Sequence, residues 1–432
     1  AGAVYLPLNA GYTPAEIAYF LSDAEARLFV CQPETLESSS PVARDAGVHS
    51  VLTLGNAGDG SLLEAALTVS DSFSDVARAA DDLAAILYTS GTTGRSKGAM
   101  LTQRNLLSNA RTLAELWQFT RDDVLIHALP IFHTHGLFVA TNTAMLTGGT
   151  MLWCRHFDAG EAIALMDRAT AMMGVPTFYT RLVVHPGLTR EATRNMRLFI
   201  SGSAPLLAET HEAFFAKTGH KILERYGMTE TNMNSSNPYV GDRRPGTVGL
   251  PLPGVALRVA DPETGAVLGP DAIGVLEVKG DNVFKGYWRM PEKTAAEFRE
   301  DGFFITGDVG KIGADGYVTI VGRAKDLIIS GGYNVYPKEV ETEIDALAGV
   351  AESAVIGVPH ADFGEGVTAV VVPKPGADLD ERAIIKALET CLARYKLPKR
   401  VIFATELPRN TMGKVQKNVL RERHADLYTK AP

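Results

Sequence analysis

The sequence predicts an α/β protein built from a large N-terminal domain and a small C-terminal domain. Up to about Gly246, short apolar strands alternate with helical stretches, which is the pattern of an α/β sheet. From there to residue 322, short strands separated by Gly, Pro and Asp turns predict a β-rich section of the large domain. A third pattern follows and predicts a small α+β domain. We place the boundary near Lys325, with residues 1–322 in the large domain and residues 323–432 in the small one.

Several elements of the large domain can be placed individually. Residues 81–87 form an apolar run that ends like a buried strand, and Thr102 can cap a helix. The apolar residues of that helix fall three or four positions apart, at Leu106, Leu107, Ala110, Leu113, Ala114 and Trp117. Further strands are predicted at residues 171–176, 196–201 and 221–226, each followed by polar residues. Because α/β sheets bind ligands at the carboxyl ends of their strands, these polar segments are candidate binding loops.

The expected order of the small domain is helix, strand, strand, helix, strand, helix. Its helices are expected over residues 337–346, 381–393 and 415–426. Its strands are expected over residues 352–358, 367–372 and 400–404. Neither domain contains an internal repeat or a low-complexity segment.

Composition excludes several classes of function. The chain has 432 residues, of which 46% are hydrophobic, so it is long enough to bury two or three cores. A net charge of −8 and the lack of a basic run argue against a nucleic-acid surface. No apolar run reaches the roughly eighteen residues that a membrane span needs, so we expect none. Cys31, Cys154 and Cys391 lie far apart without metal-like spacing, and we expect them to be reduced.

Residues 1–9 match neither a signal peptide nor the usual start of a domain. They look like an internal segment, so we expect that an upstream part of the protein is missing from this chain. A targeting signal would lie in that part. The remaining sequence leads us to expect a cytoplasmic location.

The segment from Tyr88 to Met100 carries the strongest signal for a ligand. Its glycines let the backbone approach an anion, its hydroxyls are donors, and Lys97 adds a positive charge. It is not a Walker A loop, because Ser96 stands where the second glycine of that motif belongs. The alternative is a mobile linker, but a buried strand precedes the segment and helical periodicity follows it. We therefore predict a polyphosphate cradle formed by Thr89, Ser90, Gly91, Thr92, Thr93, Gly94 and Lys97.

Four further motifs follow along the chain. They are Ser201-Gly-Ser-Ala-Pro205, Tyr226-Gly-Met-Thr-Glu-Thr231, Thr306-Gly-Asp308 with Gly322-Arg323, and Pro408-Arg-Asn-Thr-Met-Gly-Lys414. With the Ser-Gly-Thr-Thr-Gly loop, they resemble the motifs of adenylate-forming enzymes, which include acyl-CoA synthetases, luciferases and peptide-synthetase adenylation domains. The resemblance runs from residue 1 to about residue 420. It implies that the small C-terminal domain is mobile.

The resemblance implies roles for these residues in binding ATP. Tyr226 would stack on adenine, Asp308 would accept from the ribose hydroxyls, and Arg323 would lie near the ribose or phosphate. Thr229 would bond the α-phosphate, and Glu230 would hold Mg²⁺, a hard cation that takes carboxylate and phosphate oxygens. The other nucleotide-binding residues would be Gly202, Ser203, Ala204, Glu224, Arg225 and Gly227. Taken alone, a Thr-Glu turn is more often solvated and a Gly-Asp turn is ordinary turn chemistry, but the order of the motifs favours ligands.

By the same resemblance, Lys414 would be the lysine that acts in adenylation, beside Thr229 and Glu230 as catalytic residues. A compact cation suits the charge that develops between an attacking carboxylate and the α-phosphate. Asn410 departs from the threonine of the family's loop. The alternative is a basic C-terminal helix with solvated lysines, which fits Lys417 better than Lys414. A functional ammonium of this kind would also be a target for a lysine acetyltransferase.

Two histidines lie in Phe132-His-Thr-His135, a spacing that could suggest a metal. No Cys, Asp or Glu nearby completes a zinc set, so we do not expect one. By resemblance, His133 would lie at the base of an acyl pocket beside the entry of CoA. His135 would be packed.

Arg181 bears on the acid that would be activated. It falls in the region that lines the acyl pocket in the family, where an arginine would suit a second carboxylate. The alternative is an arginine on the solvated side of a helix starting near Phe178. Residues 174–182 and the Met228 loop resemble those of malonyl-CoA synthetases, so we expect malonate, followed by methylmalonate. Ser203 and Met228 would be the further substrate residues.

The resemblance thus implies an ATP-dependent acid–CoA ligase. A carboxylate would attack ATP to form an acyl-adenylate and release pyrophosphate, and CoA would then replace AMP. Between the steps the small domain would rotate about Lys325 and bring Ser330, Gly331 and Gly332 to the CoA side. The chain ends soon after Lys414 without a carrier module, which favours this branch over peptide synthetases. The alternatives are a ligase for aryl or medium-chain monocarboxylic acids and a catalytically silent nucleotide-binding relative.

Overall fold

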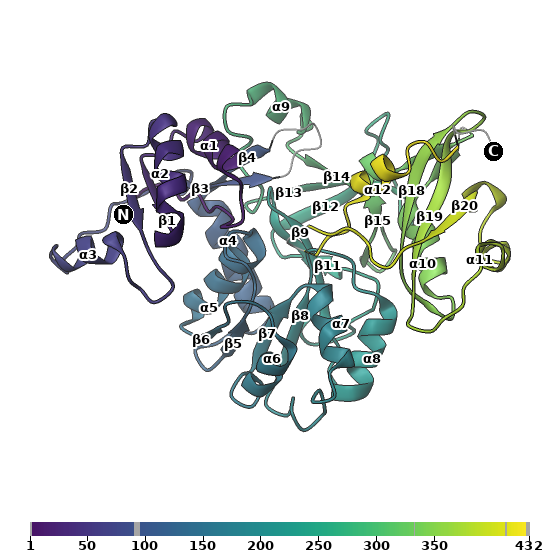
Figure 1. Cartoon of the computed structure of the whole chain (residues 1–432), viewed down its shortest axis with the longest axis horizontal. Helices are drawn as coiled ribbons and strands as arrows, with labels where there is room; N and C mark the ends of the chain where they lie inside the picture. The colour runs from purple at the N-terminus through teal and green to yellow at the C-terminus, as the bar shows by residue number, and fades with distance from the viewer. Residues whose placement is uncertain (1, 90–95, 332, 411–412, 429–432) are drawn as a thin grey trace.

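The computed structural model describes residues 2–89, 96–331, 333–410 and 413–428, which form a large part and a smaller C-terminal part (Figure 1). At the N-terminal end, β1 (Leu28–Cys31) pairs in parallel with β2 (Ser50–Thr53). The helices of this unit are α1 (Pro14–Asp23), α2 (Leu36–Asp45) and α3 (Ser61–Leu67). A capping box formed by Thr13 and Glu16 starts α1, and the two side chains accept from backbone N–H groups of its first turn.

A hairpin of β3 (Leu83–Thr89) and β4 (Lys97–Thr102) brackets the segment expected to bind phosphate. Residues 90–95, including five of the predicted cradle residues, lie outside the described part of the chain. Residues 97–102, at the end of this segment, pair with β3 as a buried strand, which was not predicted from the sequence. The predicted helix starts after that strand as α4 (Gln103–Leu116), and Thr102 caps it as expected by accepting from the backbone N–H of Asn105.

The central sheet has seven strands in the order β11-β10-β9-β8-β7-β5-β6. Its parallel strands are β5 (Val124–His127), β6 (Thr150–Trp153), β7 (Ala171–Gly174), β8 (Leu198–Ser201) and β9 (Leu223–Met228). Two antiparallel strands, β10 (Asn232–Ser236) and β11 (Leu250–Pro251), complete one edge. The three strands predicted from the sequence correspond to β7, β8 and β9, although β9 continues through Tyr226 to Met228.

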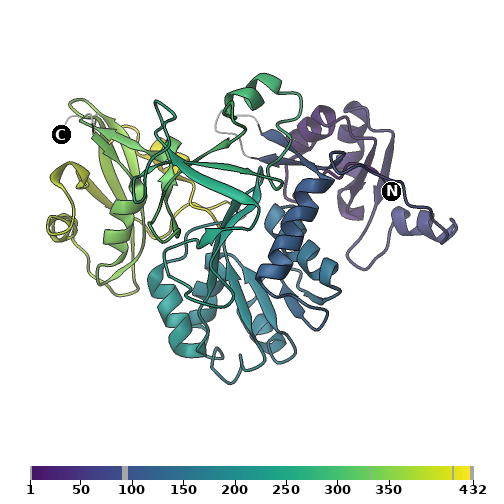
Figure 2. The same cartoon turned by 180° about the vertical axis from the view of Figure 1, so that it is seen from behind.

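Helices cover both faces of this sheet (Figures 1 and 2). Side chains alternate across each strand, so Leu198 and Ile200 of β8 join one core cluster and Phe199 joins the other. The first cluster includes residues of α4 and α5 (Thr141–Thr147). The second includes residues of α6 (Ala159–Leu165), α7 (Pro176–Val184) and α8 (Ala208–Thr218). A sheet buried on both faces exposes its ligand-binding loops only at the strand ends.

The β-rich section predicted from about Gly246 is present as an antiparallel sheet. Its strands are β12 (Val255–Ala260), β13 (Gly274–Gly280), β14 (Phe304–Ile312) and β15 (Val318–Arg323). The short helix α9 (Pro291–Ala296) lies between β13 and β14. The register places Asp308 opposite Arg323 on neighbouring strands.

The smaller part follows a 3₁₀ turn at Ala324–Asp326. Its sheet contains β16 (Ile328–Ser330), β17 (Tyr333–Val335), β18 (Val350–His360), β19 (Gly364–Pro373) and β20 (Arg400–Phe403). Its helices are α10 (Pro337–Asp345), α11 (Glu381–Leu388) and α12 (Lys417–Arg423). The predicted order is confirmed, but the β16–β17 hairpin was not predicted, and both α11 and α12 are shorter than expected. Strands of three residues give too little periodicity to identify.

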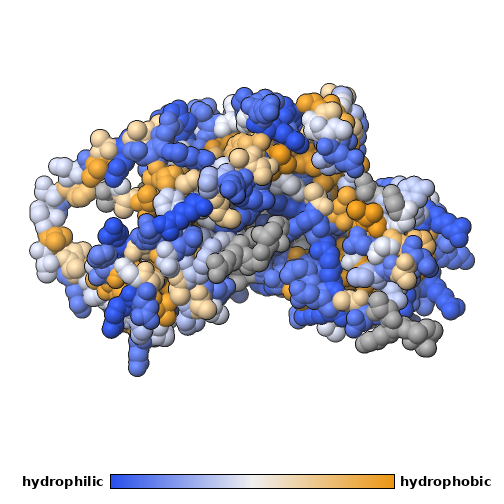
Figure 3. All heavy atoms as spheres, turned by 90° about the horizontal axis from the view of Figure 1, so that it is seen from above, coloured by the Kyte–Doolittle hydropathy of each residue, from blue (hydrophilic) through white to orange (hydrophobic). Residues whose placement is uncertain are grey.

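No helix in the described ranges is long and apolar enough to cross a membrane. On the face shown in Figure 3, hydrophilic residues surround scattered hydrophobic groups.

Candidate active site

A cavity of about 710 Å³ lies between the two parts of the molecule. On one side it is lined by the segments that follow β7 and β8, by the end of β9, and by Asp308 and Arg323. On the other side the small part contributes Lys338, Asp345, Arg409, Gly413, Lys414 and Lys417. The position at the carboxyl ends of parallel strands is the one expected for a ligand site in an α/β sheet.

The loop after β8 is built tightly against the start of β9. A side chain at Gly202 would place its Cβ 2.4 Å from the guanidinium of Arg225, so a larger residue there would require Arg225 to move. Ser203 adopts a φ of 71°, a left-handed conformation that costs a non-glycine residue free energy and often marks functional sites. Its hydroxyl lies 3.2 Å from Nδ1 of His135, which is fully buried as expected. Gly202, Ser203 and Ala204 all line the cavity, as predicted.

Tyr226, Asp308 and Arg323 form one hydrogen-bonded group in the cavity wall. The hydroxyl of Tyr226 donates to Oδ2 of Asp308, and Nε of Arg323 lies 2.7 Å from Oδ1 of the same carboxylate. Asp308 and Arg323 are paired directly across the antiparallel strands β14 and β15, which brings their side chains together. Asp308 is buried, so its carboxylate is fixed between two donors, in a state prepared to accept from a polar ligand.

Glu230 is buried in the turn between β9 and β10, next to Thr229. Burial raises the pKa of its carboxyl group, and the hydroxyl of Tyr287 donates to Oε1 at 3.0 Å. Within the described ranges, no group of three or more His, Cys, Asp and Glu side chains is placed to hold a metal ion by itself. A lone buried carboxylate fits Mg²⁺, which is usually bound through one or two carboxylates together with phosphates and waters.

Lys97 stands at the start of β4, directly beyond the undescribed residues 90–95. Its Nζ lies 3.4 Å from Oε1 of Glu297 and 4.2 Å from the ring centre of Tyr287. The lysine is buried, so its charge is held close to Glu230 rather than in solvent. Neither Glu297 nor Tyr287 was identified from the sequence, because both lie outside the recognisable motifs.

Lys414 reaches into the cavity from the small part. Its loop closes on Asn410, whose side-chain oxygen accepts from the backbone N–H of Lys414 at 3.0 Å. Asn410, which replaces the threonine of the family's loop, therefore provides an acceptor for a backbone N–H within this loop. Burial, followed by the nearby Arg323, lowers the pKa of Lys414 to about 8, while Asp308 and Glu230 oppose the shift. These influences place its ammonium within the predicted nucleotide site.

Arg225 and Arg181 both line the cavity. Arg225 is buried, and its Nε and Nη2 atoms have no hydrogen-bond partner among the described residues. Burial lowers the pKa of this guanidinium to about 9. Arg181 is exposed in the last turn of α7, a helix that begins at Pro176 rather than near Phe178. It is therefore both exposed to solvent and part of the cavity lining.

Other predicted residues lie beside the cavity or outside it. Glu224 and Gly227 line it, whereas His133 and Met228 do not. His133 is half-buried, and burial followed by Lys414 and Arg225 lowers the pKa of its imidazole to about 3, which keeps the ring neutral. Lys325, Ser330 and Gly331 do not line the cavity, and Gly332 is outside the described residues.

Comparisons with known proteins agree with this arrangement. The model of the AMP-binding enzyme family matches residues 1–288, and that of the AMP-binding enzyme C-terminal domain matches residues 339–414. A malonate–CoA ligase of Arabidopsis thaliana is 35% identical over 98% of this chain and 74% of that protein. A feruloyl-CoA synthase of an Amycolatopsis species is 37% identical over 98% and 84%. ATP-bound MatB of Rhodopseudomonas palustris is 64% identical, with a TM-score of 0.96 over 98% of this chain and 84% of MatB.

The cavity joins a lysine of the smaller part to the strand ends of the larger α/β part, and the two matched models are those of an AMP-binding enzyme. The chain belongs to the AMP-binding enzyme family. The whole chain superposes better on ATP-bound MatB than on apo MatB, which covers the same shares of both chains with a TM-score of 0.84.

Proposed function

We propose that this protein is an ATP-dependent acid–CoA ligase that forms malonyl-CoA through an acyl-adenylate and releases AMP and pyrophosphate. ATP, Mg²⁺ and CoA are its co-substrates and cofactor. The family membership, the similarity to a malonate–CoA ligase and the superposition on ATP-bound MatB support this activity. Methylmalonate, which differs by one methyl group, is the second candidate acid.

The observation that carries the choice of a dicarboxylic acid is the presence, in the cavity lining, of two arginines that have no ion-pair partner among the described residues. An unpaired buried charge is costly, and Arg225 is buried without a carboxylate partner among the described residues. Arg181 lines the same cavity. We therefore assign Arg225 to the acyl side of the site, instead of the nucleotide role expected from the sequence. A second carboxylate on the acid would accept from both guanidinium groups.

In the first half-reaction, a carboxylate oxygen of the acid attacks the α-phosphorus of ATP. The bond between the α-phosphorus and the oxygen that bridges the α- and β-phosphates breaks, and its electron pair leaves with pyrophosphate. Lys414 stabilises the charge that develops between the carboxylate and the α-phosphate, and Thr229 donates to a phosphate oxygen. Tyr226 and Asp308 bind the adenosine, and Glu230 holds Mg²⁺. When bound, this ion neutralises phosphate charge.

In the second half-reaction, the sulfur of CoA attacks the acyl carbon of the adenylate and AMP leaves with the bonding electrons. The thiol must approach where Lys414 now stands, so the small domain rotates about Lys325 between the steps. The rotation brings Ser330 and its glycine-rich neighbours to the CoA side. The absence of Ser330 and Gly331 from the cavity lining in the present arrangement is consistent with a pose that serves the first step.

A pyrophosphate-release assay with a panel of acids tests the activity. Malonate should support the fastest release, followed by methylmalonate, and mass spectrometry should detect the CoA thioester after CoA is added. Faster release with ferulate or butyrate would replace our assignment by a ligase for aryl or medium-chain acids. ATP binding without release for any acid would instead identify a silent nucleotide-binding relative.

We further propose that Lys414 is a target of a lysine acetyltransferase. The lowered pKa of about 8 leaves a share of this amine neutral, which is the form that accepts an acetyl group. Acetylation removes the charge needed for adenylation. Intact-mass analysis before and after acetyltransferase treatment, with activity measured in parallel, tests this proposal.

A cytoplasmic location is a further proposal, which cell fractionation would test.

A further inference from the structure

The carboxylate proposed to hold Mg²⁺ belongs to a larger polar network. The hydroxyl of Tyr287 lies 3.0 Å from Oε1 of Glu230 and 2.7 Å from Oε2 of Glu297. Tyr287 is buried, so its hydroxyl makes these contacts in place of contacts with water. A phenol has one proton to donate and ionised carboxylates only accept, so this hydroxyl links the two carboxylates by donating to one of them at a time.

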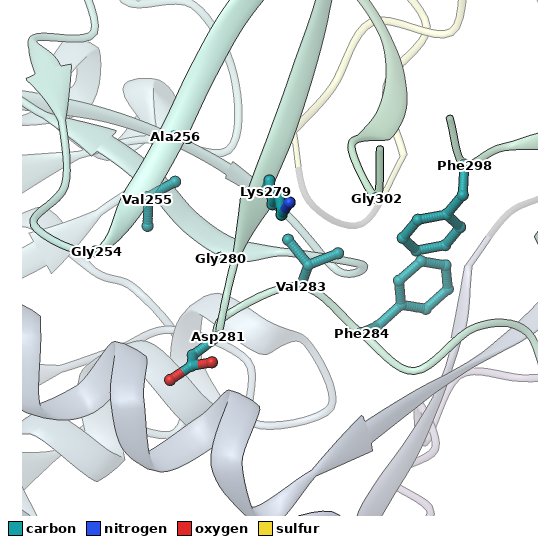
Figure 4. Close-up of a pocket in the computed structure, with 10 residues that line it drawn as sticks. All are labelled: Gly254, Val255, Ala256, Lys279, Gly280, Asp281, Val283, Phe284, Phe298 and Gly302. Atoms are coloured by element: carbon teal, nitrogen blue, oxygen red, sulfur yellow. The ribbon is translucent and has the colours of Figure 1, made fainter. Parts of the chain in front are cut away.

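The ring of Tyr287 is held on several sides. Its backbone forms a bridge with Ala99 of β4, and its N–H donates to the hydroxyl of Thr294 at 2.9 Å. Phe284 packs edge-on against the ring at 4.8 Å between centres. Figure 4 shows Phe284 next to Phe298, which packs against the same hydrophobic cluster as Tyr287. Packing therefore allows the hydroxyl little choice of position.

Glu297 is also fixed. Its Oε1 lies 2.8 Å from Nζ of Lys293 and 3.4 Å from Nζ of Lys97. Two ammonium groups thus hold one oxygen while Tyr287 contacts the other. The exposed fraction of the Glu297 side chain is only 20%, so solvent screens these charges less than at the surface.

We propose that Tyr287 and Glu297 are positioning residues for the metal-binding carboxylate Glu230. Glu297 fixes the hydroxyl of Tyr287 from one side, and the hydroxyl fixes the orientation of Glu230 from the other. Groups that orient metal ligands in this way typically change metal affinity by 10- to 100-fold when they are mutated. The inference rests on the proposed use of Mg²⁺ and ATP, but not on the identity of the acid.

The test is a titration of Mn²⁺, followed by electron paramagnetic resonance, into the full chain with a non-hydrolysable α,β-methylene analogue of ATP. Tyr287→Phe removes the hydroxyl but keeps the ring below Lys97. Glu297→Gln removes the charge at constant size, and Glu297→Asp keeps the charge on a shorter side chain. Glu300→Gln is the matched control, because Glu300 is exposed three residues further along. Binding of the analogue without metal is measured for each variant.

We expect Tyr287→Phe and Glu297→Gln to raise the dissociation constant of Mn²⁺ by about 10- to 100-fold. Binding of the metal-free analogue by Tyr287→Phe should stay close to that of the wild type, Glu297→Asp should recover part of the Mn²⁺ affinity, and Glu300→Gln should change nothing. Wild-type affinity for Mn²⁺ in both variants would overturn the proposal. So would an equal loss of analogue and metal binding, which indicates general distortion. Because no acid is present, the result is independent of whether malonate is the substrate.

Discussion

Arg225 and Arg181 approach the same cavity in different states of hydration. Arg225 is buried with two nitrogen atoms unpartnered among the described residues, whereas Arg181 is exposed. A carboxylate that enters the cavity would therefore gain more from Arg225, because its charge is screened least. Arg181 would mainly add attraction at the cavity wall, where exposed pairs contribute little.

Arg225→Met should reduce kcat/KM for malonate strongly and leave butyrate activity unchanged or higher. Loss of one partner of a buried charge pair typically costs about 2–5 kcal/mol, which corresponds to roughly 30- to 4,000-fold at 1.4 kcal/mol per decade. Arg181→Ala should move the ratio of malonate to butyrate activity in the same direction by a smaller factor. The ratio is measured by pyrophosphate release. A ratio that neither mutation moves would remove both arginines from the acyl site.

The deprotonation of Lys414 should make the rate of adenylation fall at high pH. Its pKa of about 8 means that the ammonium is present below pH 8 and is lost as the pH rises through that value. kcat/KM reports groups of the free enzyme, so kcat/KM for ATP in acyl-adenylate formation should fall above about pH 8.

Lys414→Ala should lower adenylation by about 10²- to 10³-fold, the usual loss for one preorganised charge, and should abolish that fall at high pH. The conversion of supplied acyl-adenylate to thioester should be largely retained. An unchanged fall at high pH in the mutant would assign the pKa to another group.

At the scale of elements, the connection between β15 and β16 is a single 3₁₀ turn over Ala324–Asp326. Lys325 in its centre is exposed, and few packing contacts need to break if this turn changes its dihedral angles. A 3₁₀ conformation has φ near −50 to −70°, which proline also adopts. The present arrangement of the two domains should therefore tolerate proline at position 325 better than an arrangement in which the small domain has rotated.

Lys325→Pro should spare adenylation and block transfer to CoA. Single-turnover measurements of pyrophosphate release and of thioester formation separate the two steps, and Lys325→Ala is the control for loss of the side chain alone. If the proline variant completes both steps at the wild-type rate, the hinge lies at another residue.

At the scale of the whole molecule, an ion pair joins the two domains. Nζ of Lys374 on the small domain lies 2.8 Å from Oε1 of Glu209 at the second residue of α8. Both side chains are largely exposed, so the pair contributes at most about 1 kcal/mol. If the small domain rotates as proposed, this contribution exists only in the present arrangement and would bias the balance between the two proposed poses.

Glu209→Lys should slow adenylation by up to about fivefold, the equivalent of 1 kcal/mol, without slowing the CoA step. The double variant Glu209→Lys with Lys374→Glu should restore the wild-type ratio of the two rates. Added salt should reduce the effect, because it screens exposed charges. A deficit that the charge swap does not repair would show that the mutation acts within α8 and not between the domains.

Much of the fold and of the nucleotide site could be predicted from local sequence. The strands β7, β8 and β9 are continuous buried runs, and Thr102 caps α4 through residues only three positions away. Residues such as Gly202, Tyr226, Asp308, Arg323 and Lys414 belong to short motifs, and the structure brings these five to one cavity. Such signals depend on neighbours in the chain, so the amino-acid sequence by itself determined them.

Tertiary structure alone decided the groups whose partners are distant in sequence. Lys97 meets Glu297 across 200 positions, and Tyr287 joins Glu297 to Glu230 from a segment without a recognised motif. Arg225 belongs to a predicted binding motif, but only its burial against Gly202 shows a cation without a partner. Local patterns encode helices, strands and turns. The burial and pairing of a charge depend on which strands the sheet places side by side.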